Sequence, residues 1–366
     1  MNIHLWLNCL QQDLFPALES ELGLLTPKET EFVRLVEFCQ LHTLMAPFQW
    51  KGNGRKPLCR LALAKAFLAK MVWNLPATEQ LIDRLRSAPS LRRLCGWDSV
   101  SDIPDRGTFS RAFEQFAKEQ LPQLAHSQLI KTHLGDRLIG HVSIDSTAIH
   151  GREAIVKTPQ PTDSPAQPKR RGRPKKGEVL PPAPDKRLDL QPHRTLEENL
   201  ADLPTVCTKG CKRNSQGYSE TWDGFKFHIG ATDFDIPICG ILTSASLHDS
   251  QAAIPIIQSA KARISNILYN LMDSAYDAPQ IHDFSRAQGH VPIIDPNLRR
   301  SANPRRLAPH EKSRFKERSS VERVNSNLKD NWGGRFVRVR GAAKVACHLF
   351  FGILALTADR LIAILP

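Results

Sequence analysis

The sequence lacks an uninterrupted hydrophobic run that could cross a bilayer. Its most apolar stretch, residues 345–365, contains His348, Asp359 and Arg360, and unpaired charges in a membrane core are costly. The first residues lack the basic start and long apolar run of a secretory signal. We therefore expect residues 345–365 to form a buried core helix in a cytoplasmic protein that has no membrane partner.

Cysteines at zinc-binding spacing are also scarce. The eight cysteines are scattered, and most should be reduced in a cytoplasmic protein. Cys207 and Cys211 loosely resemble half of a zinc knuckle, but no second Cys or His pair follows at a fitting distance. The sequence therefore implies no tetrahedral zinc site.

Acidic residues are outnumbered by basic ones, 37 against 50, which gives a net charge of +13. This excess predicts attraction to polyanions, with nucleic acid as the first candidate and an anionic membrane surface as the second. The content of apolar residues (41%) is that of an ordinary globular protein, and 366 residues suggest two or three structural units.

The first part of the chain has helical periodicity. Apolar residues recur at helical spacing in residues 58–73, 78–97 and 108–134, so we assign residues 1–140 to an all-helical N-terminal domain. Such a domain could serve for packing alone. A cluster of arginines also permits a role in DNA binding or dimerisation; its members are Arg84, Arg86, Arg92 and Arg93.

Residues 155–214 form a basic insertion that is rich in proline and charge. Up to about residue 200 it carries too few large apolar groups to offset its chain entropy, so we expect it to be largely disordered. Its Arg171-Gly172-Arg173-Pro174 core resembles an AT-hook, in which arginines enter the minor groove of A·T-rich DNA. The alternative is a solvated linker that binds phosphate without sequence preference.

Residues 141–154 and 215–366 alternate between strand-like and helix-like segments. Strands are expected at 141–145, 224–232, 236–247, 267–273 and 290–296, and helices at 250–264, 278–288 and from about 312. This order is that of an α/β domain with a ribonuclease-H-like mixed sheet, in which residues 155–214 interrupt the chain after the first strand.

Two aspartates end apolar strands of this sheet. Asp145 follows the first strand and Asp273 the fourth, where rigid backbones can place paired carboxylates at one cleft. Such a pair suits hard cations such as magnesium or manganese. A single aspartate after a strand is often only a helix cap. Asp277 is a weaker alternative to Asp273, because it lies where a helix would be capped.

A helix over residues 315–332 supplies a third acid. At about 100° per residue, Phe315, Arg318, Glu322 and Lys329 share one edge of the helix, next to an apolar edge that would pack on the sheet. The alternative is an ordinary amphipathic helix with solvated charges.

At these residues the chain resembles the bacterial insertion-sequence DDE transposases. Their signature is tyrosine, two residues, arginine, three residues, glutamate, six residues and lysine, which fits Phe315, Arg318, Glu322 and Lys329 except that phenylalanine replaces tyrosine. That change removes a hydroxyl. The resemblance extends to residues 103–111, 144–147, 222–228, 247–250 and 272–277.

The resemblance implies a mechanism. Asp145, Asp273 and Glu322 would hold two Mg²⁺ or Mn²⁺ ions, and the enzyme would cut double-stranded DNA at the element ends and join those ends to target DNA. Arg318 and Lys329 would neutralise phosphates beside the metals, and Phe315 would assist at the same place. Lys226 could touch the DNA backbone or serve the structure of a strand edge. A homodimer on DNA is expected because two ends must be brought together.

Three other functions remain open at this point. A degenerate or repurposed copy would bind DNA without cutting it. A metal-dependent nuclease would cut without strand transfer. An architectural protein would act through the basic hook and would not need the carboxylates.

Overall fold

The N-terminal region of the protein, up to Leu134, is helical, as predicted. The computed structural model describes residues 6, 8–54, 56–156, 186–213, 216–297 and 306–365. The helices of this region are α2 (Phe15–Leu22), α3 (Pro27–Cys39), α4 (Arg60–Val72), α5 (Thr78–Ser87), α6 (Pro89–Cys95), α7 (Arg106–Lys118) and α8 (Leu121–Leu134), with short turns at Leu10–Leu14, Leu41–Leu44, Ala46–Phe48 and Val100–Asp102. Side-chain caps define some of the starts: Thr26 and Glu29 form a capping box, and Asp105 accepts from the Thr108 N–H.

A mixed six-stranded sheet follows. Its strands are β1 (Leu138–His150), β2 (Thr208–Arg213), β3 (Ser219–Thr232), β4 (Pro237–Ser244), β5 (Asn266–Met272) and β6 (Val291–Ile294). They lie in the order β2-β3-β1-β5-β6, and β4 pairs with β3. The pairs of β3 with β1, β2 and β4 are antiparallel, whereas β1 with β5 and β5 with β6 are parallel. The predicted α/β class with a mixed sheet is confirmed.

Helices cover both faces of the sheet. Ser143 of β1 accepts a hydrogen bond from Ser320 of α14 (Ser319–Asn331). On β3, Gly230 faces Val142 and Ile256, the latter in α11 (Ser250–Lys261). Successive strand residues point to opposite faces, so α11 and α14 lie on opposite sides. Helix α12 (Pro279–Ala287) contacts α11 and β6.

The helix expected over residues 315–332 is not continuous. Helix α13 (Pro309–Phe315) and α14 are separated by a 3₁₀ turn, η7 (Lys316–Arg318). A 3₁₀ turn has about three residues per turn instead of 3.6, so the angles predicted for one continuous α-helix do not hold across it. Arg318 and Glu322 nevertheless remain one helical turn apart.

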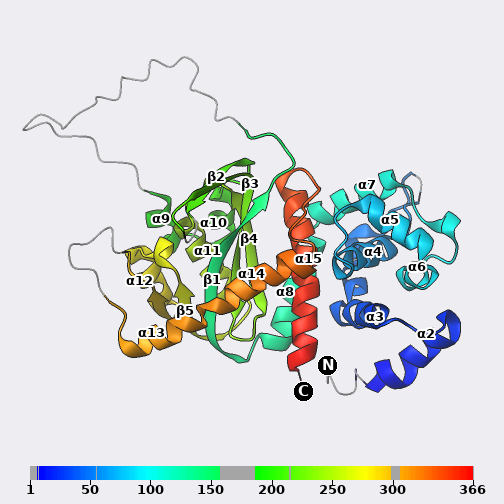
Figure 1. The fold of residues 1–366 in the computed structure, drawn as a ribbon, viewed down its shortest axis with the longest axis horizontal. Coiled ribbons are helices and arrows are strands. Elements are labelled where there is room, and N and C mark those ends of the chain that lie inside the picture. The colour runs from blue at the N-terminus through cyan, green and yellow to red at the C-terminus, as the bar shows by residue number, and fades with distance from the viewer. Residues whose placement is uncertain are drawn as a thin grey trace, which may run out of the picture.

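The C-terminal helix α15 (Ala342–Ile364) packs against both the helical region and the sheet. It runs between the helical region and the sheet (Figure 1), and it contacts α3, α4, α7, α8 and β4. By length and composition it could cross a membrane, but 72% of its most apolar window is buried inside the protein. The predicted core helix is confirmed in this respect. Gly352 permits a close crossing, since a Cβ there would lie 2.3 Å from the Trp332 carbonyl oxygen.

One prediction was wrong for part of the insertion. Residues 186–213 form α9 (Arg187–Leu190), a 3₁₀ turn (Gln191–His193), α10 (Leu196–Asp202) and β2. Polar side chains dock the segment on α11, because Gln191 donates to the Gln251 carbonyl (2.7 Å) and Asn199 donates to Gln258 (2.9 Å). The hook residues Arg171, Gly172, Arg173 and Pro174 lie outside the described residues.

Candidate active site

The first two predicted acids lie side by side. Ile144 of β1 pairs in parallel with Met272 of β5, so Asp145 and Asp273 follow at the same level on strands about 4.8 Å apart. Asp145 lies within β1, which continues to His150 instead of ending at residue 145. Asp273 leaves β5 and caps the 3₁₀ turn η6 (Ser274–Tyr276), where its carboxylate accepts from the Ala275 N–H at 2.9 Å.

Both aspartates resist ionisation. Burial raises the pKa of Asp145 to about 7, against the opposing effect of the Arg318 guanidinium, and Asp273 raises it further. Burial also raises the pKa of Asp273, against the Ala275 N–H and Arg318. Two neighbouring carboxylates whose charged forms are disfavoured are stabilised by any cation placed between them.

Arg318 connects this pair to the third acid. Its guanidinium is ion-paired with Glu322, and its Nη1 lies 3.9 Å from Asp145 Oδ2. The Arg318 side chain is 18% exposed and that of Glu322 is 53% exposed. The ring of Phe315 lies 5.9 Å from the guanidinium carbon, which is within cation–π range. The structure therefore brings together five of the predicted residues: Asp145, Asp273, Phe315, Arg318 and Glu322.

Lys329 lies close enough to Asp145 for their charges to interact. Burial lowers its pKa, the nearby cations Lys212 and Arg335 lower it further, and Asp145 acts in the opposite direction. A half-buried ammonium among other cations is well suited to receive an anion.

The side chains of the three acids are chemically suited to a hard cation. Within the described ranges, no three His, Cys, Asp or Glu side chains form a ready metal-binding group. The oxygen donors of Asp145, Asp273 and Glu322 are the type that Mg²⁺ and Mn²⁺ prefer. The buried hydroxyl of Tyr276 has no hydrogen-bond partner. Burial raises its pKa, and the nearby carboxylates of Asp249, Asp145 and Asp273 raise it further, so it lies beside the pair.

Lys226 does not reach toward solvent. Its ammonium donates to the Leu247 carbonyl and to Asp249, both at 2.8 Å, and its side chain is 13% exposed. These contacts favour the structural alternative over the predicted contact with the DNA backbone. Asp277 is likewise engaged, because it accepts from the Asn297 N–H and lies 3.0 Å from His282.

Sequence reasoning missed two acids near the pair. Asp249 precedes α11 without capping it by a side-chain bond and pairs with Lys226, and it raises the pKa of both Asp145 and Asp273. Asp295 also raises the pKa of Asp273. Asp295 directly follows β6, the position relative to its strand that singled out Asp273, so the same signal could have found it. Asp249 does not directly follow a strand, and only the resemblance over residues 247–250 included it.

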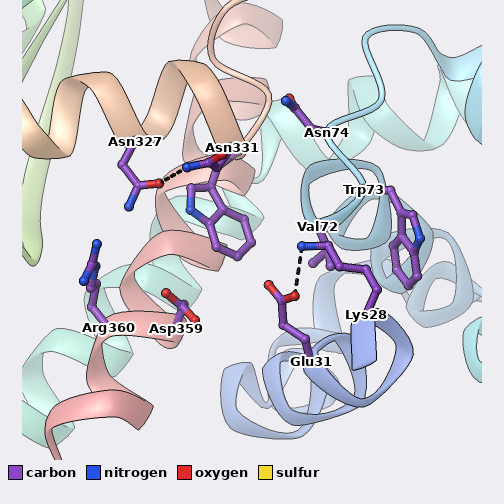
Figure 2. A pocket seen from close by; sticks show the side chains of 10 residues that line it. Lys28, Glu31, Val72, Trp73, Asn74, Asn327, Asn331, Asp359 and Arg360 are labelled. Carbon is purple, nitrogen blue, oxygen red and sulfur yellow. Dashed lines mark hydrogen bonds and ion pairs between the residues drawn. The ribbon is translucent and has the colours of Figure 1, made fainter. Parts of the chain in front are cut away.

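A cleft adjoins the acids, and a separate cavity lies at the far end of α14. The cleft has a volume of about 880 Å³ and is lined by Ser274, Asp295 and Phe315, among others. The cavity, of about 480 Å³, lies between α3, α4, α14 and α15. Figure 2 shows Asn327 and Arg360 on one side of it and Lys28 and Trp73 on the other.

Two family models match much of the chain. A family model described as "Transposase DDE domain" matches residues 138–358, and one described as "Transposase domain (DUF772)" matches residues 24–115. Proteins from two strains of Halobacterium salinarum, each named "Probable transposase for insertion sequence element ISH11", are 27% identical to the chain over 152 residues. The alignment covers 37% of this chain and 46% of each relative, so the chain spans about half the length of these relatives.

No solved structure matches the chain. The first family model covers more than half of the chain and includes Asp145, Asp273 and Glu322. The chain therefore belongs to the transposase DDE domain family.

Proposed function

We propose that this protein cuts the DNA ends of an insertion sequence and joins them to target DNA, with Asp145, Asp273 and Glu322 as the metal-binding triad. The observation that carries the proposal is the parallel register of β1 and β5, which places Asp145 beside Asp273. Arg318, which pairs with both Asp145 and Glu322, supports the third assignment.

The strand order supports a ribonuclease-H-like core. Three antiparallel strands, β4, β3 and β1, are followed across the sheet by the parallel strands β5 and β6. We propose a helical N-terminal domain at residues 1–140 and a catalytic domain at residues 141–154 and 215–366. Because residues 186–213 dock on α11 and β3, we add them to the catalytic domain.

Asp145, Asp273 and Glu322 would hold Mg²⁺ or Mn²⁺, in the two-ion arrangement of the resemblance. When bound, the ions supply Lewis acidity that activates an attacking hydroxyl and stabilises a leaving oxygen. The fit rests on the chemistry of the donors and on the raised pKa values of Asp145 and Asp273, which a cation would lower.

The protein's cations would bind the substrate. Arg318 and Lys329 would neutralise phosphates of double-stranded DNA next to the acids. In the first reaction a water oxygen bonds to phosphorus and the 3′ oxygen leaves as a hydroxyl. In the second, that 3′ oxygen attacks a target phosphodiester and releases another 3′ hydroxyl. One phosphodiester replaces another, so no external energy source is required. A homodimer would bring the two ends together.

The test is an end-cleavage and joining assay. A duplex carrying the inverted repeats that flank the gene is incubated with the protein, Mg²⁺ and target DNA. We expect cleavage and joining by the wild type and by Asp283→Ala, whose carboxylate is exposed on α12, and neither reaction by Asp145→Ala, Asp273→Ala or Glu322→Ala. Cleavage that survives all three substitutions would refute the triad.

The same assay separates the alternatives. Cleavage without joining would favour a nuclease. Salt-dependent DNA binding with no cleavage by the wild type would favour a degenerate or repurposed copy. Cytoplasmic location stays a prediction of the sequence.

A further inference from the structure

The third acid poses a positioning problem. Asp145 and Asp273 lie on paired strands whose hydrogen bonds fix their separation. Glu322 instead lies in the first turn of α14, which packs on β1 and β3. A helix packed on a sheet can slide or rotate unless specific contacts hold it, so contacts near Glu322 decide where its carboxylate lies relative to Asp145.

The turn between β3 and β4 reaches both elements. It is closed by a hydrogen bond from the Thr232 N–H to the Ile236 carbonyl (2.9 Å), and Asp235 adopts the left-handed region at φ 57°. On one side, Asp233 Oδ2 accepts from the Gly140 N–H of β1 at 3.1 Å. The turn is therefore attached to the strand that carries Asp145.

On its other side the turn holds α14. Both carboxylate oxygens of Asp235 accept from Arg323, at 2.8 and 2.7 Å. Arg323 also donates to Ser319, one helical turn earlier, at 2.8 Å. A bidentate guanidinium–carboxylate pair fixes orientation as well as distance, and Arg323 is the residue next to Glu322. The pair thus acts on the turn of α14 that carries the acid.

We propose that residues 232–236 form a brace between β1 and α14, and that Asp233, Asp235 and Arg323 are positioning residues that set Glu322 against Asp145. The proposal rests on the proposed function, because it concerns the same triad. None of the three needs to touch DNA or metal. Their effect is transmitted through the backbone of β1 at Gly140 and of α14 at Arg323.

Gly140 adds an independent requirement. A Cβ at this position would lie 2.6 Å from Asp233 Oδ2, too close for the hydrogen bond to persist. Gly140→Ala should therefore detach the turn from β1 while leaving the bond between Asp235 and Arg323 available. The contact of the turn with β1 and its contact with α14 can therefore be removed separately.

The main variant is Asp235→Asn, because asparagine tolerates the left-handed turn but loses the charge. Its matched control is Asp283→Asn, which also removes a carboxylate paired with an arginine, Arg286, but on α12. Mn²⁺ affinity is measured without DNA by electron paramagnetic resonance. The kcat and KM of end cleavage are measured on the inverted-repeat duplex, and thermal midpoints are compared.

We expect Asp235→Asn to weaken Mn²⁺ binding and to lower kcat by roughly 10- to 100-fold, the cost of a displacement near 1 Å, with KM for DNA unchanged. Arg323→Gln should do the same, the double variant should be no worse than either single variant, and Arg323→Lys should recover part of kcat. Asp283→Asn should match the wild type.

Two outcomes would overturn the brace. One is an Asp235→Asn protein that matches Asp283→Asn in Mn²⁺ affinity and kcat. The other is a double variant whose losses add. If Asp235→Asn does not fold, Gly140→Ala and Arg323→Gln take its place, and the same losses of Mn²⁺ affinity and kcat are expected for them. Failure of the proposed function is distinguishable, because Asp145→Ala and Glu322→Ala would then keep both Mn²⁺ binding and cleavage.

Discussion

Arg318 holds two of the acids that the proposed function assigns to metal ions. Its guanidinium pairs with Glu322 and lies 3.9 Å from Asp145, with Phe315 behind it. A bound cation and this guanidinium would compete for the same negative charge. Substrate phosphate is the natural alternative partner for a displaced arginine, so metal binding and DNA binding should favour one another.

Replacing Arg318 should therefore raise the affinity for metal. We expect Arg318→Met to bind Mn²⁺ more tightly than the wild type in the absence of DNA. Added DNA should raise the Mn²⁺ affinity of the wild type but not that of Arg318→Met. Electron paramagnetic resonance titration of Mn²⁺ measures both effects. Arg286→Met, which removes a cation from α12, serves as the control. Unchanged Mn²⁺ affinity in Arg318→Met would mean that the guanidinium does not compete with metal.

At the scale of elements, the far end of α14 is tied to the helical region. Asn74 follows α4, donates to the Asp330 carbonyl (2.7 Å) and accepts from the Gly333 N–H (3.1 Å). It adopts a left-handed conformation at φ 49°. The two bonds connect segments more than 250 residues apart at the rim of the cavity in Figure 2.

Two substitutions of Asn74 distinguish the stability that comes from its hydrogen bonds from the cost of its left-handed backbone conformation. Asn74→Gly loses both hydrogen bonds, which should lower the free energy of unfolding by about 1–3 kcal/mol. Asn74→Ala loses the same bonds and adds left-handed strain, so it should be less stable than Asn74→Gly by about 1 kcal/mol. Urea unfolding measures the difference. Equal stability of the two variants would show that the left-handed conformation is not maintained.

At the scale of the whole molecule, three buried histidines contact other elements of the fold. His126 of α8 contacts the Pro237 carbonyl, and His348 of α15 contacts the Gly333 carbonyl, at 2.8 and 2.9 Å. His228 of β3 contacts Thr243. Burial lowers the pKa of His126 and His348 to about 3 and that of His228 to about 4.

These shifts predict destabilisation by acid. Between about pH 4 and 6.5 these histidines bind protons in the unfolded chain but stay neutral in the folded protein. The free energy of unfolding should therefore fall as the pH falls, by about 1.4 kcal/mol per pH unit for each histidine. Urea unfolding in EDTA at a series of pH values measures the slope. A flat profile across this range would contradict the buried, neutral state of these rings.

Asp145 should act in the opposite direction. Burial raises its pKa from 3.8 to about 7, so between these pH values the folded protein keeps a proton that the unfolded chain has lost. The contribution of Asp145 to the free energy of unfolding therefore falls as the pH rises from about 3.8 to about 7. Asp145→Asn should therefore give a steeper pH dependence than the wild type.

Much of the fold could be predicted because its signals are local. Helical periodicity marked the N-terminal region, and apolar runs marked β4, β5 and β6 close to their observed bounds. The end of β3 was also marked, but the strand begins at Ser219, five residues earlier than expected. The segment 186–213 was misjudged because its docking uses Gln191 and Asn199, whose hydrogen bonds to α11 leave no trace in composition. The 3₁₀ turn before α14 was missed because a break of three residues hardly changes the apolar pattern.

The sequence by itself determined which residues were candidates, since strand-end aspartates and the spacing from Phe315 to Lys329 are properties of short segments. Only the tertiary structure decided how they meet. Strand pairing placed Asp145 beside Asp273, Arg318 joined Asp145 to Glu322, and Asp235 held Arg323 across 88 residues of chain. The physical reason is that periodicity reports which face of an element is buried, whereas partners and register depend on packing between elements far apart in the sequence.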